Sequence, residues 1–108
     1  MSELDYRTTR ILKALGNPLR FRILRALLQG PATPTELARA LGRRLDAVSR
    51  NLGVLRSLDL VWYHPRVNRL VYRVKHGTVG SFLAAAQECA RVARVSGPAP
   101  DWGDGVVL

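Results

Sequence analysis

Apolar residues recur every three or four positions through most of this chain, with one interruption where the pattern changes. Such spacing places apolar side chains on one face of a helix, which has about 3.6 residues per turn. Glycine and proline divide the pattern into segments. It predicts five helices, over residues 2–15, 18–29, 34–41, 44–58 and 78–95.

Signals at the helix ends support these boundaries. The tripeptide Gly16-Asn17-Pro18 ends one helix with glycine and starts the next with a capping asparagine and a proline. Thr33-Pro34-Thr35-Glu36 has the spacing of a capping box. Arg44 stands where Ser or Thr would be expected, so the helix that follows is predicted to begin without a good cap.

Residues 37–60 join two of these helices through a tight turn at Gly42. The second helix is polar on one face near its start, where side chains can donate to phosphates or reach base edges. Its other face is apolar, with a stripe made of Leu45, Val48, Leu52 and Leu55. Two helices joined in this way are the plan of a helix-turn-helix.

After the fourth helix, positions 60–64 and 70–74 are rich in β-branched and aromatic residues, which is typical of strands. The turn between them, residues 65–69, carries two arginines. This hairpin would form the wing of a winged helix. We therefore predict a mainly α fold with a small β-hairpin, a winged helix-turn-helix of four helices, two strands and a fifth helix.

The 108 residues are enough for one domain with a modest core. We assign residues 1–95 to a winged helix-turn-helix domain for DNA binding and dimerisation. Residues 96–108 are rich in glycine and proline and are predicted to form a flexible C-terminal tail. The sequence does not indicate what Trp102, isolated in this tail, would contact.

The formal net charge is +9, and arginine makes up 15 of the 17 basic residues. A genome that favours arginine codons would explain the preference for arginine over lysine, but not the position of the charge. Nine basic residues and only two acids lie between Arg39 and Lys75. This concentration is typical of a protein that binds a polyanion such as DNA.

Several other classes of protein are disfavoured. Cys89 is the single cysteine, which excludes an intramolecular disulfide. We find no signal peptide and no stretch long enough to span a membrane, so we expect a cytoplasmic protein without membrane contact. Enzyme motifs such as a phosphate-cradling glycine loop, HExxH or a nucleophile elbow are absent, and no function as an enzyme is predicted.

The start of the helix over 44–58 is the candidate for reading base edges in the major groove. Arg50 would bind guanine, Asn51 would bind adenine and Ser49 would contact phosphate. Asp46 would accept from cytosine or orient an arginine. An ordinary solvated helix face is the alternative. The predicted recognition residues are Asp46, Ala47, Ser49, Arg50 and Asn51.

Two further groups of basic residues are candidate DNA contacts. Arg43 and Arg44, in the turn before the recognition helix, are placed to contact phosphate. The alternative is that they are two ordinary solvated side chains. Arg66, Asn68 and Arg69 occupy the wing tip, where arginine would enter the minor groove. The alternative for the wing is a charged edge that prevents strand-to-strand aggregation.

Four segments of this chain resemble the ArsR/SmtB family of bacterial and archaeal winged-helix repressors. They are KALGNPLRFRILRAL at 13–27, ELA at 36–38, VSRNLGVL at 48–55 and LV at 60–61. The resemblance implies a homodimer, built on the first and last helices, that binds a palindromic operator. Residues of this chain that would form the dimer interface are Leu4, Ile11, Leu12, Phe82, Leu83, Ala86, Cys89 and Ala93.

Many members of that family release DNA when they bind a metal, through cysteines at the third helix or through histidines and carboxylates on the last. This chain has no cysteine in its third helix and no histidine in its last. We therefore predict no metal site and no cofactor. Cys89 could still pair with a second copy as a redox switch, and His64 and His76 could bind a metal at a dimer interface, but a packing cysteine and two unrelated surface histidines are the favoured interpretations.

Together these observations favour a sequence-specific DNA-binding transcriptional regulator, a dimeric repressor with double-stranded DNA as its partner. A winged-helix module for protein assembly, a general architectural DNA binder and an activator whose effector is supplied by a partner protein remain alternatives. The sequence leaves open the operator, the inducer and the direction of the transcriptional response.

Overall fold

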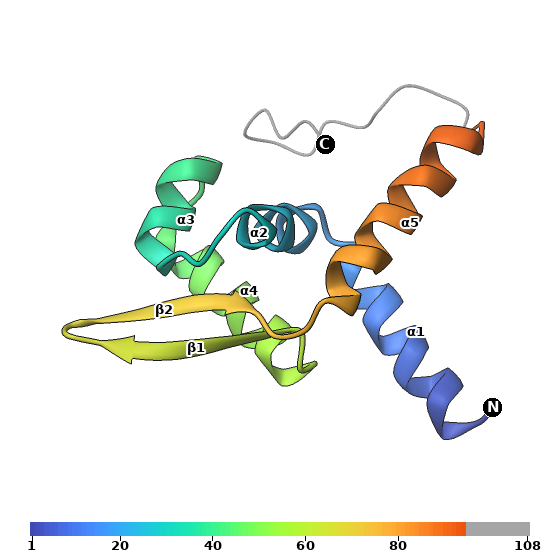
Figure 1. Cartoon of the computed structure of the whole chain (residues 1–108), viewed down its shortest axis with the longest axis horizontal. Coiled ribbons are helices and arrows are strands. Elements are labelled where there is room, and N and C mark those ends of the chain that lie inside the picture. The colour runs from blue at the N-terminus through green and yellow to red at the C-terminus, as the bar shows by residue number, and fades with distance from the viewer. Residues whose placement is uncertain (95–108) are drawn as a thin grey trace.

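The computed structural model describes residues 1–94. Its elements follow the predicted order, and Figure 1 shows the hairpin extending to one side of the helices, with α1 and α5 at the opposite side. Residues 95–108, including Trp102 and the predicted tail, lie outside the described residues. The elements are α1 (Glu3–Leu15), α2 (Pro18–Leu28), α3 (Pro34–Leu41), α4 (Leu45–Ser57), β1 (Val61–Arg66), β2 (Arg69–Val74) and α5 (Thr78–Val92).

Side-chain caps explain why three helices begin where they do. Ser2 Oγ accepts a hydrogen bond from the backbone N–H of Asp5 at the start of α1, and Asn17 Oδ1 accepts from the N–H of Arg20 in α2. The capping box of α3 is confirmed by reciprocal bonds of 2.8 and 3.1 Å between Thr33 and Glu36. The start of α4 has no side-chain cap, as predicted from Arg44.

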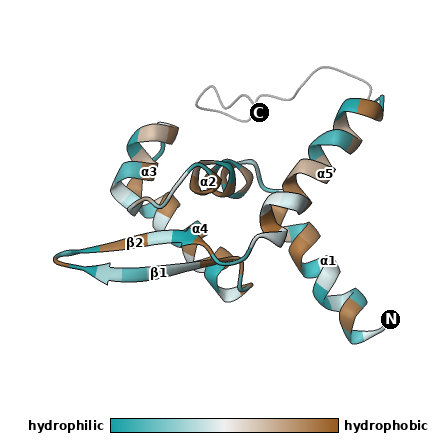
Figure 2. Ribbon diagram, in the orientation of Figure 1, coloured by the Kyte–Doolittle hydropathy of each residue, from teal (hydrophilic) through white to brown (hydrophobic). Residues whose placement is uncertain are grey.

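The core lies between α2, α3 and α4 and is closed by the base of the hairpin and the start of α5. In Figure 2, α2 is seen nearly end-on and its visible part is mainly brown, the colour of hydrophobic residues. Burying a large apolar side chain stabilises the fold by about 1.5–3 kcal/mol relative to leaving it exposed. The largest fully buried side chains are those of Ile23, Leu24, Leu37, Val48, Leu52, Leu55 and Val61.

Two expectations about helix faces were wrong. Leu45, predicted to be part of the apolar stripe of α4, is 49% exposed, because it is the first residue of the helix and extends beyond the core. The apolar period of residues 18–29 also predicts that Arg20 faces solvent, but its side chain is half-buried and makes hydrogen bonds to two other helices.

The wing is an antiparallel hairpin with a shorter turn than predicted. Arg66 pairs with Arg69, so the loop contains only Val67 and Asn68, instead of residues 65–69. Asn68 takes a φ of 61°, a left-handed conformation that asparagine tolerates better than most residues. Tyr72 exchanges backbone hydrogen bonds of 2.8 and 3.0 Å with Ala32, and this bridge ties the wing to the segment between α2 and α3.

The first half of α1 and the second half of α5 extend away from the body of the domain (Figure 1). Leu4 is 66% exposed and Leu12 is 52% exposed, so residues 1–94 leave part of the apolar face of α1 uncovered. Among the helices described, none combines the length and the apolar character needed to cross a membrane.

Candidate DNA-binding surface

The polar start of α4 is exposed as predicted. Asp46, Ser49 and Arg50 all face solvent, whereas Ala47 is half-buried and packs against the core. Their backbone is held in place because Val48 and Leu52, on the opposite face, are completely buried. Three of the five predicted recognition residues are therefore accessible to a ligand, and Ala47 offers it only a partial surface.

Asn51 is a correction to the predicted recognition set. Its side chain is only 8% exposed, and both ends of its amide are engaged inside the protein. Nδ2 donates to the Ala47 carbonyl at 2.8 Å, and Oδ1 accepts from Arg20 Nε at 2.9 Å. Position 51 follows Val48 by three residues and precedes Leu55 by four, which is the spacing of the buried face and could have identified it.

Arg44 and Asp46 form an ion pair at the N-terminal end of α4, with 3.2 Å between Arg44 Nε and Asp46 Oδ1. Asp46 Oδ1 also accepts from the backbone N–H of Ala47 at 2.8 Å. The hydrogen bonds from Arg44, followed by that from Ala47, hold the pKa of Asp46 below its ordinary value of 3.8. The carboxylate therefore orients an arginine, which is one of the two roles predicted for it.

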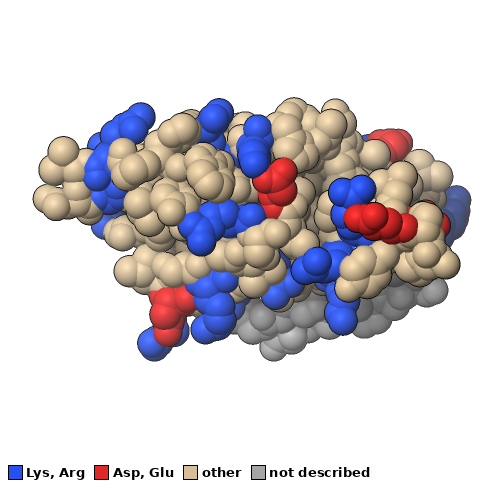
Figure 3. Space-filling view, turned by 90° about the horizontal axis from the view of Figure 1, so that it is seen from below, with Lys and Arg blue, Asp and Glu red and all other residues tan. Residues whose placement is uncertain are grey.

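Arg43 is half-buried and lies at a cleft of about 310 Å³ between the start of α2 and the start of α4. Arg50 lines the same cleft, together with the capping residue Asn17. The turn arginine and the recognition arginine thus border one hollow. Figure 3 shows blue Lys and Arg side chains spread along the face seen from below, with fewer red acidic ones among them.

The wing arginines Arg66 and Arg69 are exposed, as is Asn68. Asn68 and Arg69 line a second cleft, of about 480 Å³, that also contains Leu45 and Ser49 from α4. The structure therefore brings the wing tip and the recognition helix to one continuous surface. Arg66, whose Nη1 donates to the Pro65 carbonyl, is not among the lining residues of that cleft.

Two residues on this surface were missed by the sequence reasoning. Leu45 was assigned to the core, yet it is half exposed beside Ser49. An exposed aliphatic side chain in this position is suited to contact a thymine methyl group. Thr35, in the first turn of α3, lines the same cleft and offers a hydroxyl. The sequence did not single out Thr35 as a DNA contact, because the segment Thr33–Glu36 was interpreted only as a helix cap.

The predicted dimer residues differ in how far they are exposed in the single chain. Leu4, Leu12, Ala86, Cys89 and Ala93 are exposed, and Ile11 and Phe82 are half-buried. Leu83 is only 3% exposed within the single chain and belongs to the core of the domain, so its assignment to a dimer interface was wrong. Cys89 also differs from the favoured interpretation, because it is exposed instead of packed inside.

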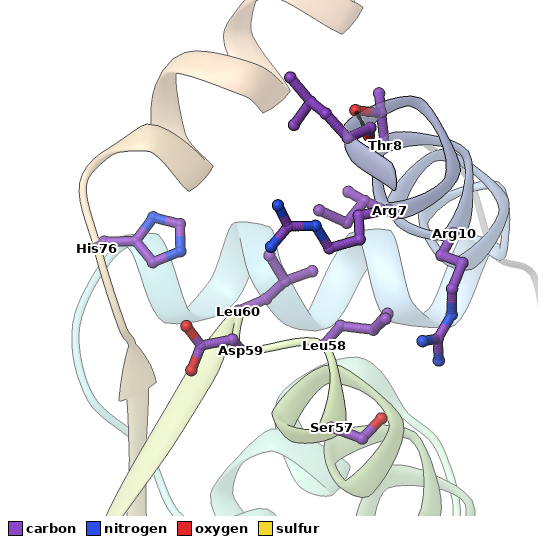
Figure 4. A pocket seen from close by; sticks show the side chains of 10 residues that line it. Arg7, Thr8, Arg10, Ser57, Leu58, Asp59, Leu60 and His76 are labelled. Atoms are coloured by element: carbon purple, nitrogen blue, oxygen red, sulfur yellow. Dashed lines mark hydrogen bonds between the residues drawn. The ribbon is translucent and has the colours of Figure 1, made fainter. Parts of the chain in front are cut away.

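The surfaces of α1 and α5 meet at an apolar hollow of about 270 Å³, lined by Ile11 and Leu12 from α1 and by Val79 and Phe82 from α5. Beside it lies a more polar cleft of about 470 Å³, shown in Figure 4, into which the Arg7 side chain extends, with His76 across the cleft. His76 contacts Thr78, and Asp59 pairs with Lys75. These pairings do not form a nucleophile–base–acid arrangement.

Among the described residues, neither histidine belongs to a cluster of metal ligands. His64 Nε2 accepts a hydrogen bond from Arg73 Nε at 2.8 Å across the hairpin. Within residues 1–94, no group of three or more His, Cys, Asp or Glu side chains is placed to hold a metal ion. The expectation of no metal site and no cofactor stays a prediction.

Comparisons with known proteins agree with this geometry. Residues 15–61 match a family model described as a helix-turn-helix domain. The HTH-type transcriptional regulator NmtR of Mycobacterium tuberculosis is 40% identical over 75 residues, which cover 69% of this chain and 62% of NmtR. The chain therefore spans less than two thirds of the length of that relative.

Solved structures give the same result. The homodimeric winged helix-turn-helix DNA-binding domain of Mb0332 from Mycobacterium bovis, a possible ArsR-family transcriptional regulator, is 33% identical. The match covers 84% of this chain and 88% of that one, with a TM-score of 0.76. Rv0081 of M. tuberculosis is 29% identical over 85% of this chain and 94% of its own, with a TM-score of 0.77. By its sequence and its fold, this chain belongs to the ArsR family of winged helix-turn-helix transcriptional regulators.

Proposed function

We propose that this protein is a dimeric repressor that acts in the cytoplasm by binding a palindromic operator. The observation that carries the proposal is the single surface formed by the exposed start of α4 and the wing. Ser49 and Arg50 are presented to solvent at the start of the helix, and Arg69 borders the same cleft as Ser49. Base edges in the major groove and phosphates beside it are the ligands that such a surface fits.

A homodimer is supported by the apolar face of α1 that the described residues leave uncovered and by the exposed small side chains of α5. Leu4 and Leu12 would be covered by a second copy, and Ala86 would allow a partner helix to approach closely. The related Mb0332 domain is described as homodimeric. In a dimer with two-fold symmetry, two recognition helices would enter successive major grooves about 34–36 Å apart, which requires a palindromic site.

Repression follows from occupancy, because a dimer bound over a promoter excludes the transcription machinery. An effector would act by changing the populations of DNA-competent and DNA-incompetent dimers. We propose no resident metal or cofactor, since the third helix lacks cysteine and the last lacks histidine.

The test begins with selection of bound duplexes from a random-sequence pool, followed by fluorescence anisotropy at several salt concentrations. The DNA immediately upstream of the gene is tested in parallel. We expect a palindromic sequence to be enriched and to bind about 10³-fold or more tightly than a scrambled duplex of the same composition. Run-off transcription from a promoter that contains the site should then decrease as protein is added.

Other outcomes identify the alternatives. Equal and strongly salt-dependent binding to both duplexes would indicate an architectural DNA binder. Absence of binding together with a stable co-purifying protein would indicate an assembly module, and increased transcription would indicate an activator.

A further inference from the structure

Arg20 lies between three helices of the domain. It occupies the first turn of α2, where its own backbone N–H is held by Asn17 Oδ1 at 3.1 Å. From this fixed base, Nη1 donates to the carbonyl of Ala14 in α1 at 3.2 Å, and Nε donates to Asn51 Oδ1 in α4 at 2.9 Å. One planar guanidinium thus connects the last turn of α1 to the recognition helix.

Both acceptors of the Arg20 guanidinium are held in fixed positions by the protein. The Ala14 carbonyl lies at the C-terminal end of α1, where it also accepts from the backbone N–H of Asn17 at 3.4 Å and where a positive charge is favourable. Asn51 is 8% exposed, and its Nδ2 is held by the Ala47 carbonyl, so Oδ1 has a fixed direction. Lysine could not replace Arg20, because its ammonium group lacks the rigid fork that reaches both acceptors.

The connection through Arg20 matters because it joins α4, which carries the candidate DNA-binding surface, to α1, which carries the proposed dimer interface. Asn51 directly follows Arg50, the candidate base-reading residue, and α1 carries the exposed apolar residues of the proposed dimer interface. A palindromic operator requires two recognition helices at one fixed separation. Whatever fixes α4 relative to α1 therefore sets that separation in the dimer, whereas attraction to phosphates does not depend on it.

We infer that Arg20 is a positioning residue for operator recognition, which acts through Asn51 by fixing the recognition helix relative to the dimer helix. The inference rests on the proposed function, since it concerns how a dimeric regulator discriminates its operator. Arg20 is not required to touch DNA for this role. Its removal should reduce the preference for the operator while leaving the electrostatic attraction to any duplex almost unchanged.

The test is a double-mutant cycle with Arg20→Met, Asn51→Ala and the double variant. Arg25→Met, an exposed arginine of the same helix that lies over the Phe21 ring, is the control for loss of one positive charge. Affinities for the selected operator and for a scrambled duplex are measured by anisotropy. Circular dichroism and sedimentation ensure that each variant is folded and dimeric at the temperature of the assay.

We expect each single variant to lower the ratio of operator to scrambled affinity by about tenfold. The double variant should lose no more than either single one, because both changes break the same connection. Affinity for the scrambled duplex and its salt dependence should stay within about twofold of the wild type, and Arg25→Met should leave the ratio unchanged within the same margin.

A wild-type ratio in folded Arg20→Met would overturn the inference, as would independent, multiplying losses in the double variant. Equal losses on both duplexes would show that Arg20 contacts phosphate directly. If Arg20→Met does not fold, Asn51→Ala tests the same bond from the other side, and a normal ratio in that variant is decisive against the inference. A wild-type protein without operator preference would instead contradict the proposed function itself.

Discussion

Asp46 holds Arg44 across the first turn of the recognition helix, with 3.2 Å between Arg44 Nε and Asp46 Oδ1. Both side chains are largely exposed, at 85% for Arg44 and 63% for Asp46, so the pair adds little to stability. The pair matters for DNA binding, because the Asp46 carboxylate would repel phosphates and the Arg44 guanidinium, paired with it, is not free to bind them.

Asp46→Asn should therefore strengthen binding to DNA of any sequence. We expect the affinity for a scrambled duplex to rise by roughly threefold for the one additional phosphate contact that Arg44 can make, and the ratio of operator to scrambled affinity to fall. Anisotropy on both duplexes measures this. Glu88→Gln, which releases Arg91 from an equivalent exposed pair on α5, should change neither affinity. Weaker binding of Asp46→Asn to both duplexes would contradict the prediction that the Asp46 carboxylate repels DNA phosphates.

Arg50→Ala should weaken operator binding by about 1–3 kcal/mol and relax discrimination at one base pair. The reason is that Arg50 is the exposed arginine within the start of α4, where the fork of a guanidinium can bind the edge of guanine. Titration against a set of operators with single base-pair changes identifies the position. Arg56→Ala, in the last turn of the same helix, is the control. Equal losses on operator and scrambled duplexes would exclude base reading by Arg50.

Arg66→Ala and Arg69→Ala should each lower the salt slope of binding by about one, because each removes a cation that displaces a counterion from DNA. The slope is obtained from anisotropy titrations between about 50 and 200 mM salt. Arg91→Ala, on α5 and away from the wing, should leave the slope unchanged. An unchanged slope in both wing variants would remove the wing tip from the interface.

Much of the fold could be predicted from the sequence because its signals are local. The capping box at Thr33 and Glu36 and the break at Gly16-Asn17-Pro18 act within a few residues, and the structure places helix starts where they indicate. The position of the recognition helix and the existence of the wing follow from periodicity for the same reason. The membership of the ArsR family that the motifs suggested is confirmed by the comparisons.

The errors concern residues whose surroundings are set by other elements. Leu83 was assigned to a dimer surface because α5 is apolar, but the neighbours that bury it come from the rest of the domain. Arg20 has no partner within its own helix that would reveal its inward position, and its two acceptors are 6 and 31 residues away along the chain. Leu45 continues the apolar period beyond the point where the core ends.

Leu12→Glu should convert the proposed dimer to a folded monomer. Leu12 is 52% exposed, so a charge there disturbs little within one chain but would be buried without a partner in a dimer. Sedimentation equilibrium measures the mass, and operator binding should be lost with it. Leu45→Glu, at a leucine of similar exposure on α4, should leave the dimer intact. A dimeric Leu12→Glu protein would place the interface elsewhere.

Glu36→Gln tests how the capping box responds to pH. Hydrogen bonds from the Thr33 backbone N–H and hydroxyl hold the pKa of Glu36 below its ordinary value of 4.5. A carboxyl whose pKa is lower in the folded state stabilises the fold above pH 4.5, and that contribution is lost as the pH falls through the folded pKa. Glu36→Gln should therefore unfold at a lower temperature than the wild type at pH 7, and the difference should shrink as the pH is lowered beneath 4.5.

Thermal unfolding of Glu36→Gln and the wild type at several pH values measures this difference directly, and the comparison cancels the effect of the remaining acids. Glu3→Gln, an exposed glutamate in the first turn of α1 outside any capping box, should show a much smaller difference at neutral pH. A gap between wild type and Glu36→Gln that is the same at every pH would mean that the carboxylate charge has no part in the cap.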